Sequence, residues 1–421
     1  MRGAPTASRR RRLVAAGLGS AVLLLAAGCS GGGGDGSASA PPPCNSPGVT
    51  SEEVKVGLIY PDSGPLANVF AAARGGFEAR IGLANDSGGV HGRTVRVVWA
   101  DDAGAQEKNG SAARQLVERD GVFAIAELST AASGSAQYLA DAGIPVVGLA
   151  AEREWNDYDN MFAQAYIHSS GGSVTTFGMF AKAQGGTKVA VVEEALTESV
   201  RVLSDQMIAS MRGQGVELAA RIPYTVGQSS PARTVQAIAD SGADVLIVQT
   251  PIEGLREIVA ASRQAGVSYK AVLSSVAYDK TLLAQAGADL AGVTAVFEHI
   301  PWESDSPALR QFRDAVARYS PATTDPDQVT VLASYVVGDM LLRGLELAGE
   351  CPTREAFHSK LRALTNYEAA GLIPGGIDLS SNRGRMSLCF TFATVNAEGT
   401  AYQVVPSPSG GEQWCGTRFE T

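Results

Sequence analysis

The sequence predicts an α/β protein with two parallel β-sheets, because short apolar strands alternate with amphipathic helices along most of the chain. The expected strands are almost continuously apolar, as they are when helices cover both faces of a parallel sheet. The alternation runs through two successive series, which indicates two lobes of similar, Rossmann-like construction. A chain of 421 residues is long enough for two domains.

The first series of expected elements begins after residue 50. Apolar residues between Phe70 and Ala84 recur at the three- and four-residue spacing of one helix face, and β-rich runs flank this segment. Strands are therefore expected over 54–60, 94–99, 122–128 and 144–149, and helices over 70–84, 112–119 and 131–142.

The second series repeats the pattern and then becomes helical. Strands are expected over 188–192, 216–224, 244–249, 270–274 and 293–299, with helices over 174–183, 200–211, 232–240 and 255–264. Three further helices are expected over 307–319, 328–348 and 354–364, followed by a closing hairpin over 386–395 and 401–405. A helical return after the second series predicts that the chain crosses between the lobes more than once.

The first 28 residues are typical of an export signal. The basic block Arg9–Arg12 precedes an apolar run that is too short to span a bilayer comfortably. The following Ala-Ala-Gly-Cys resembles a bacterial lipoprotein cleavage site, after which Cys29 would carry lipid; an ordinary secretory signal with an incidental Cys is the alternative. Residues 30–43 contain only Gly, Ser, Ala, Pro and one Asp, so the segment 29–50 is predicted to be a flexible tether. The expected location is the outer face of the cytoplasmic membrane.

Charge and cysteine content restrict the partners and the compartment. Without the signal and its five arginines, 29 basic residues stand against 43 acidic ones, which disfavours nucleic acid and an anionic lipid surface as partners. Four cysteines remain beyond Cys29, an even number that suggests two disulfides in an exported protein. Of three pairings, Cys389–Cys415 is preferred because both residues flank the expected hairpin, which leaves Cys44–Cys351; free buried thiols are the alternative.

The sequence carries no recognisable catalytic or cofactor motif. Its one Gly-x-Ser-x-Gly match, Gly28–Gly32, lies at the junction of the signal and the tether with no strand before it, so it is no nucleophile elbow. The sequence contains no His-Glu-x-x-His pair and no Gly-x-x-x-x-Gly-Lys-Ser/Thr phosphate loop. The cysteines and histidines are scattered without metal-ligand spacing. We therefore expect no enzymatic activity, no cofactor and no bound metal.

Several segments resemble type I periplasmic solute-binding proteins, the branched-chain amino acid and amide receptors of ABC importers. Val56–Leu66 (VGLIYPDSGPL) is similar to their opening strand and loop, and Gly88–Gly92 and Ala142–Val147 continue the series, so that the resemblance covers roughly 52–375. It implies two Rossmann-like lobes joined by a three-strand hinge, which close over a solute. The crossovers are expected near 164–169, 298–302 and 368–375, with lobe 1 formed by 51–167 and 301–368 and lobe 2 by 168–300 and 369–421.

The ends of the expected first-lobe strands supply candidate ligand contacts, because ligands of open parallel sheets bind at the carboxyl ends of strands. Ser63 could donate to an anionic group, and Ser129 and Thr130 match the family's carboxylate position, although both are also good helix N-caps. Where the family holds an amino group, this chain has Ala150, Ala151 and Glu152. The carboxylate of Glu152 replaces the family's Thr and could bind an ammonium or a polyol, or remain solvated.

Further candidates come from the second lobe and from the first loop. Tyr166, Glu198, Thr250 and Tyr278 lie at the corresponding edges, although each could equally be a core or surface residue. Phe70 adjoins Val69, where the family has a ligand-stacking Tyr. The acidic residue that the family uses near Ser275 is absent, which argues against a branched-chain amino acid as the ligand.

The resemblance implies a lipid-anchored receptor that closes on a small polar, amino-acid-like solute. It would deliver the solute to a membrane permease driven by an ATPase subunit, and it is expected to be a monomer because it must dock and open. A ligand-sensing lipoprotein of the same fold is the alternative, and an extracellular hydrolase on this scaffold is a third.

Overall fold

A computed structural model describes residues 44–64, 66–166, 172–194 and 198–420. These residues belong to one compact unit, Ala40–Thr421. The predicted signal, the lipidation site Cys29 and residues 29–43 of the predicted tether lie outside the described residues.

The first sheet is entirely parallel, with the strand order β2-β1-β3-β4-β5. Neighbouring residues of its first strand along the chain belong to different hydrophobic clusters, Leu58 to one and Ile59 to another. Because successive side chains of a strand point to opposite faces, each face of this sheet is buried by its own layer. The strands are β1 (Glu53–Tyr60), β2 (Thr94–Asp101), β3 (Ile125–Glu127), β4 (Val146–Gly148) and β5 (Met161–Phe162).

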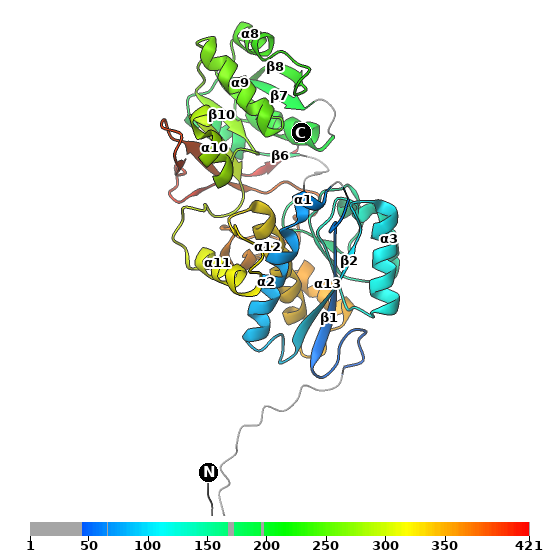
Figure 1. Cartoon of the computed structure of the whole chain (residues 1–421). Helices are drawn as coiled ribbons and strands as arrows, with labels where there is room; N and C mark the ends of the chain where they lie inside the picture. Colours follow the sequence, from blue (N-terminus) through cyan, green and yellow to red (C-terminus); the bar gives the residue numbers. More distant parts are fainter. Residues whose placement is uncertain (1–43, 65, 167–171, 195–197, 421) are drawn as a thin grey trace, which may run out of the picture. The chain divides into compact units, whose positions relative to one another are not determined.

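Helices from two distant parts of the chain cover this first sheet. Helix α2 (Ala73–Asp86) packs against α12 (Val329–Ala348), and α3 (Gln106–Arg114) lies on the other side of β1 and β2 (Figure 1). We call the first sheet with these helices the first lobe. Its remaining helical segments are α1 (Ala67–Phe70), the π-turn Gln115–Arg119, the 3-10 turn Ala132–Gly134, α4 (Ala136–Asp141), α5 (Glu154–Asp157), α11 (Pro307–Tyr319) and α13 (Arg354–Arg362).

The second sheet has the strand order β13-β12-β11-β10-β9-β7-β8, with β14 also paired to β12. It is parallel from β8 to β11 and becomes antiparallel where the C-terminal hairpin joins β11. Its strands are β7 (Lys188–Glu194), β8 (Glu217–Tyr224), β9 (Val245–Gln249), β10 (Ala271–Ser274), β11 (Val293–Phe297), β12 (Cys389–Val395), β13 (Tyr402–Val404) and β14 (Gln413–Cys415).

Helices also cover both faces of the second sheet, and together they form the second lobe. Val192 and Leu246 face the cluster that includes α8 and α9, whereas Val191 and Ile247 face the cluster that includes α6 and α7. A small antiparallel pair, β6 (Ser173–Val174) with β15 (Arg418–Phe419), lies beside α7. The helices are α6 (Thr176–Ala183), α7 (Glu198–Gly213), α8 (Pro231–Ser241), α9 (Ile252–Gln264) and α10 (Lys280–Leu290), and the 3-10 turn Ala369–Gly371 precedes β12.

The predicted fold class is confirmed, but several elements differ from those expected. The region expected as a helix over 131–142 is a 3-10 turn followed by the six-residue α4. Helix α10 was not expected, and neither were β5, β6, β14 and β15. The segment of α10 is rich in Ala and contains Gly287, which gives it no amphipathic pattern. That glycine is required by packing, because a Cβ there would lie 1.9 Å from the Gly399 carbonyl oxygen.

The structure joins Cys44 to Cys351 and Cys389 to Cys415, the two pairs expected from the sequence. The first pair ties the segment before β1 to the loop between α12 and α13. The second pair links residues that face each other across the β12–β14 ladder. The N-terminal segment is thus fixed covalently to the first lobe, and the end of the chain is fixed to β12 of the C-terminal hairpin.

Candidate functional site

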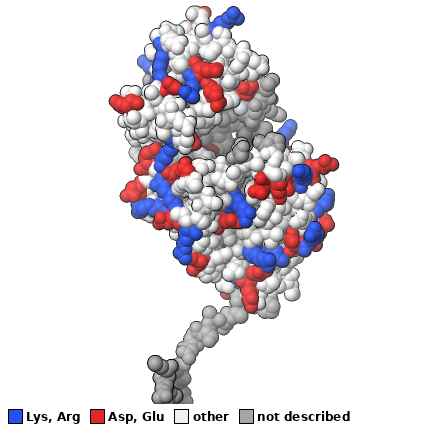
Figure 2. All heavy atoms as spheres, viewed as in Figure 1, with Lys and Arg blue, Asp and Glu red and all other residues white. Residues whose placement is uncertain are grey.

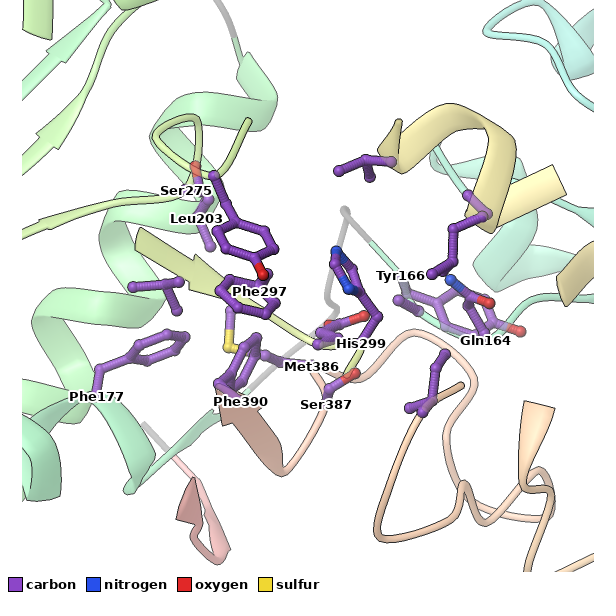
Figure 3. A pocket seen from close by; sticks show the side chains of 18 of the residues that line it. Gln164, Tyr166, Phe177, Leu203, Ser275, Phe297, His299, Met386, Ser387 and Phe390 are labelled. Atoms are coloured by element: carbon purple, nitrogen blue, oxygen red, sulfur yellow. The ribbon is translucent and has the colours of Figure 1, made fainter. Parts of the chain in front are cut away.

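A cavity of about 400 Å³ lies between elements of the two lobes (Figure 3). This volume falls within the range of roughly 300–1,000 Å³ that is common for small-molecule sites. Its walls comprise Gln164, Ala165, Tyr166, Phe177, Leu203, Met207, Gln249, Ser275, Tyr278, Val296, Phe297, Glu298, His299, Val329, Leu332, Ala333, Ile373, Met386, Ser387 and Phe390.

The carboxyl ends of parallel strands position the polar part of this wall. Gln249 is the last residue of β9, Ser275 follows β10, and Glu298 follows β11. These three strands are neighbours in the second sheet, so their ends meet at one edge. The first lobe contributes Tyr166, which bridges to Ala150 beyond β4, and the beginning of α12.

Most of the remaining wall is apolar and aromatic. Phe177 of α6 and Phe390 of β12 have ring centroids 4.6 Å apart, and Leu203 and Met207 of α7 lie beside them. At the start of α12, Val329 is an apolar residue with 50% of its surface exposed. Exposed apolar side chains that line a cavity are suited to receive an apolar ligand group.

Tyr278 is held in place by the segment that leads from β11 back to the first lobe. Its ring stacks on Phe297 at a centroid distance of 3.7 Å. Its hydroxyl donates to Glu303 Oε2 at 2.6 Å and accepts the Trp302 backbone N–H at 2.6 Å. Burial, followed by the bond to Glu303, raises the pKa of Tyr278 far above its ordinary value, so the hydroxyl stays neutral.

An ion cluster next to Tyr278 connects the two lobes. The buried carboxylate of Asp327 accepts from Arg313 Nε of α11 at 2.7 Å and pairs with Lys280 at the start of α10. Arg313 also donates to the Trp302 carbonyl at 2.7 Å. Burial opposes ionisation of Asp327, but its hydrogen bonds and the two cations lower its pKa overall. The crossover beside the cavity is therefore fixed by a charged group that remains ionised.

Two polar residues at the start of this crossover, Glu298 and His299, face the cavity. Burial raises the pKa of Glu298 to about 7, and a hydrogen bond from the Ser387 hydroxyl partly opposes this shift. Burial lowers the pKa of His299 to about 4, so the imidazole is neutral at pH 7. In Figure 3, His299 lies between Phe297 on one side and Gln164 and Tyr166 on the other.

Two of the residues predicted from the sequence, Tyr166 and Tyr278, line this cavity. Thr250 is buried next to Gln249 and donates to the Pro251 carbonyl, but it is not part of the wall. Glu198 begins α7, and its side chain lies outside what the structure describes.

The other predicted residues lie in the first lobe, outside the wall of the cavity. Ser63 donates to Asp101 Oδ2 at 2.5 Å, and Phe70 is buried in the core. Ser129 accepts from the Ala131 N–H at 3.1 Å, which is a local turn bond, and neither the following 3-10 turn nor α4 has a side-chain cap. Thr130 is exposed.

Ala150, Ala151 and Glu152 follow β4, beside the end of β3. Ala150 is buried, and Glu152 accepts from Ser133 Oγ at 2.6 Å and from its N–H at 3.2 Å. Burial raises the pKa of Glu152, and these two bonds oppose the shift. Apart from the core residue Phe70, the predicted first-lobe residues therefore lie at one edge of the first sheet. The hydrogen bonds that connect them to Asp101, Ala131 and Ser133 all join residues of the same lobe.

Sequence reasoning missed Glu298, His299 and Gln164 as site residues, because it assigned their positions to crossovers. A signal was present, since a carboxylate and an imidazole directly follow a buried, mostly apolar strand. At the carboxyl end of a parallel strand, such a pair is favourably placed to contact a ligand.

The described ranges contain no group of three or more His, Cys, Asp or Glu residues that could hold a metal ion. Within the same ranges, no helix is long and apolar enough to cross a membrane. On the face shown in Figure 2, acidic and basic side chains are interspersed over both lobes. This face therefore offers no large patch of a single charge.

Two α/β lobes with a cavity at the carboxyl edge of a parallel sheet define a two-lobed small-molecule binding protein. The periplasmic binding protein family matches residues 53–400. The chain belongs to this family. A Leu/Ile/Val-binding protein homolog from Brucella melitensis is 35% identical over 78 residues, which are 18% of this chain and 21% of that relative, so the match spans about a fifth of the relative's length.

Solved structures share the fold at low sequence identity. A protein from Rhodospirillum rubrum, assigned to a branched-chain amino acid ABC transporter, has a TM-score of 0.71 at 18% identity, covering 84% of this chain and 100% of its own. A fatty acid ABC transporter substrate-binding protein from Thermomonospora curvata has a TM-score of 0.63 at 18% identity, covering 89% and 94%. A solute-binding protein from R. palustris in complex with 4-hydroxybenzoate has a TM-score of 0.65 at 18% identity, covering 87% and 98%.

Proposed function

We propose that this protein is an extracytoplasmic solute receptor that binds a small amphipathic molecule in the cavity and delivers it to an ABC transporter. Family membership and the transport proteins that share the fold support this role. The observation that carries the proposal is the cavity itself, with apolar walls and a few polar groups at the end of β11. Such a site can hold a solute without changing it chemically.

The cavity favours a solute with a larger apolar part than an amino-acid-like polar solute would have. Phe177, Met207 and Phe390 contribute apolar surface, and burying such surface is worth about 25 cal/mol per Å². The similar proteins from T. curvata and R. palustris are described with a fatty acid and with 4-hydroxybenzoate, two molecules that combine an apolar body with a polar head.

The predicted first-lobe residues would complete the site when the lobes close on the solute. Ser129, Thr130 and Glu152 lie at the carboxyl edge of the first sheet, the edge at which ligands of parallel sheets bind. Closure would exclude water and strengthen each polar contact with the solute. The motion would use the three crossovers expected from the sequence.

Lipid attachment at Cys29 would keep the receptor at the outer face of the cytoplasmic membrane, near the permease and its ATPase partner. The two disulfides fit an oxidising compartment outside the cytoplasm. A monomer is the form we propose, since docking and opening require free faces on both lobes.

Native mass spectrometry of residues 40–421, purified without refolding, tests this function. We expect a co-purified small molecule and, when solute is added back to emptied protein, a smaller radius of gyration in X-ray scattering. Protein that arrives empty and gives no melting shift with amino acids, aromatic acids, fatty acids or amines would refute the receptor role.

A further inference from the structure

The buried polar side-chain atoms of this cavity wall that lack a hydrogen-bond partner among the described residues can all accept a hydrogen bond from a ligand. His299 Nδ1 lies 2.7 Å from the Ile300 carbonyl oxygen, which can only accept, so the proton is on Nδ1 and Nε2 of the neutral ring is an acceptor. Nε2 is buried without a hydrogen-bond partner in the described chain, and so is Gln164 Oε1. Glu298, which directly precedes His299, belongs to the same wall, and its carboxylate accepts when ionised.

The Tyr166 hydroxyl, which can donate as well as accept, is buried without a hydrogen-bond partner in the described chain. The Tyr278 hydroxyl donates to Glu303, and the Ser275 hydroxyl donates to Gln249 Oε1 at 2.7 Å. A ligand carboxylate would therefore have the Tyr166 hydroxyl as a donor but no cation among the described wall residues to balance its charge, and burying such a charge is costly.

No Lys or Arg is among the described residues that line the cavity. The internal residues outside the described ranges, 65, 167–171 and 195–197, contain none either in the sequence. Arg385 and Arg418 line an adjoining cavity of about 100 Å³, which shares Glu298 and Ser387 with the larger one. Arg418 donates through one terminal nitrogen to the Met386 carbonyl at 3.1 Å, and its Nε is buried without a partner in the described chain.

We propose that the solute is a cationic amphiphile, an amine on an aromatic or alkyl body, whose ammonium binds Glu298 and His299 Nε2. This inference rests on the proposed function and specifies its ligand class. The ammonium would donate a hydrogen bond to each of these two side chains, and the carboxylate would supply the opposite charge. The apolar body would lie against Phe177, Leu203 and Phe390.

The burial of Glu298 adds a dependence on pH. Because its pKa is raised to about 7 in the empty protein, the carboxyl group is partly protonated at neutral pH. Amine binding needs the ionised form, so affinity should increase as pH rises from 6 to 8. The other titratable or charged side chains that line either cavity are Tyr166, Tyr278, His299, Asp378, Arg385 and Arg418. His299 stays neutral over this range, and burial raises the pKa of both tyrosines further from it.

Three probes with the same phenylbutyl body test the head group: 4-phenylbutylamine, 4-phenylbutanol and 5-phenylpentanoate, titrated calorimetrically into residues 40–421. The amine should bind most tightly and the carboxylate most weakly. Glu298→Gln should weaken binding of the amine by about 10- to 100-fold, as expected for the loss of a charge-assisted hydrogen bond. The affinity for the alcohol should change by less than about threefold. The exposed Glu398→Gln serves as the matched control.

The head-group order and its pH dependence are measured on the unmodified sequence, so the result stands even if Glu298→Gln folds poorly. Tighter binding of the carboxylate, equal binding of all three probes, or binding of none overturns the amine assignment. Binding of an amino acid or a fatty acid in place of these probes would overturn the amine and leave the receptor role intact. Absence of binding by every class would overturn both.

Discussion

At the scale of single residues, the first lobe contains a carboxyl group that is fully shielded from solvent. Glu127, the last residue of β3, accepts from Asn109 Nδ2 at 3.1 Å and from Ser135 Oγ at 2.9 Å. The same Asn109 amide donates to the buried carboxylate of Asp102 at 3.0 Å. Burial, with smaller repulsion from Asp102 and Glu152, raises the pKa of Glu127 from its ordinary value of 4.5 to about 7.

This shift makes the stability of the protein depend on pH. Between pH 4.5 and 7 the folded state binds more protons at Glu127 than the unfolded state does. Protonated Glu127 therefore contributes fully to the free energy of unfolding below pH 4.5. This contribution, on the order of 3 kcal/mol, is lost as pH rises through 7. Glu127→Gln, which stays neutral, should remove this loss, so the gain in melting temperature over the unmodified protein should be larger at pH 8 than at pH 5.

Thermal unfolding at both pH values measures the effect. Glu398→Gln, in the exposed turn before β13, should change stability little at either pH. A Glu127→Gln protein whose difference from the unmodified protein is the same at pH 5 and pH 8 would show that Glu127 is ionised in the folded state throughout.

At the scale of elements, the sequence predicted the long, strongly patterned segments correctly and failed where tertiary contacts decide. The strands β1, β7 and β9 each contain an apolar run, and their positions agree with the expected ranges. β5 and β14 are only two and three residues long and form because a neighbouring strand supplies the ladder. Neither the β-propensity of these residues nor their hydrophobic periodicity indicates that a pairing strand is present.

The pairing of α2 with α12 depends on a glycine. At Gly76 an added Cβ would lie 2.1 Å from the Val331 carbonyl oxygen and 2.3 Å from Ser334 Oγ. Gly76→Ala must push the two helices apart, and overpacking of this kind costs typically about 1–3 kcal/mol. Urea unfolding of the purified variant should show that loss of stability.

Gly338→Ala, across the same interface, is the matched control. Its Cβ would meet Arg80 Cβ at 3.2 Å, a contact that small shifts can relieve. The higher helix propensity of Ala, about 1 kcal/mol, offsets the remaining cost. Equal destabilisation by the two variants would contradict the close-approach explanation and indicate a general sensitivity of these helices to substitution.

At the scale of the whole molecule, the sequence predicted the two-lobed fold and pointed to the carboxyl ends of the strands as the place for a site. It did not predict which residues form the wall of the cavity. The rule that ligands bind beyond strand ends directed attention to Tyr278, which follows β10 and lines the cavity. It could not identify Phe177, Leu203 or Phe390, since helices and a C-terminal strand bring these residues to the cavity through packing. Ligand chemistry depends on such distant juxtapositions, which a single sequence does not encode in any local pattern.

The two disulfides should differ in how much they stabilise this fold. Cys44 and Cys351 are separated by 307 residues, whereas Cys389 and Cys415 are separated by 26. In the chain-entropy relation, a longer closed loop restricts the unfolded chain more, which favours the first bridge by about 2 kcal/mol. Cys44→Ser with Cys351→Ser should therefore reduce the free energy of unfolding more than Cys389→Ser with Cys415→Ser. Urea unfolding of both double variants of residues 40–421 measures this difference, and an equal or larger loss for the shorter loop would show that local packing around β12 and β14 outweighs loop entropy.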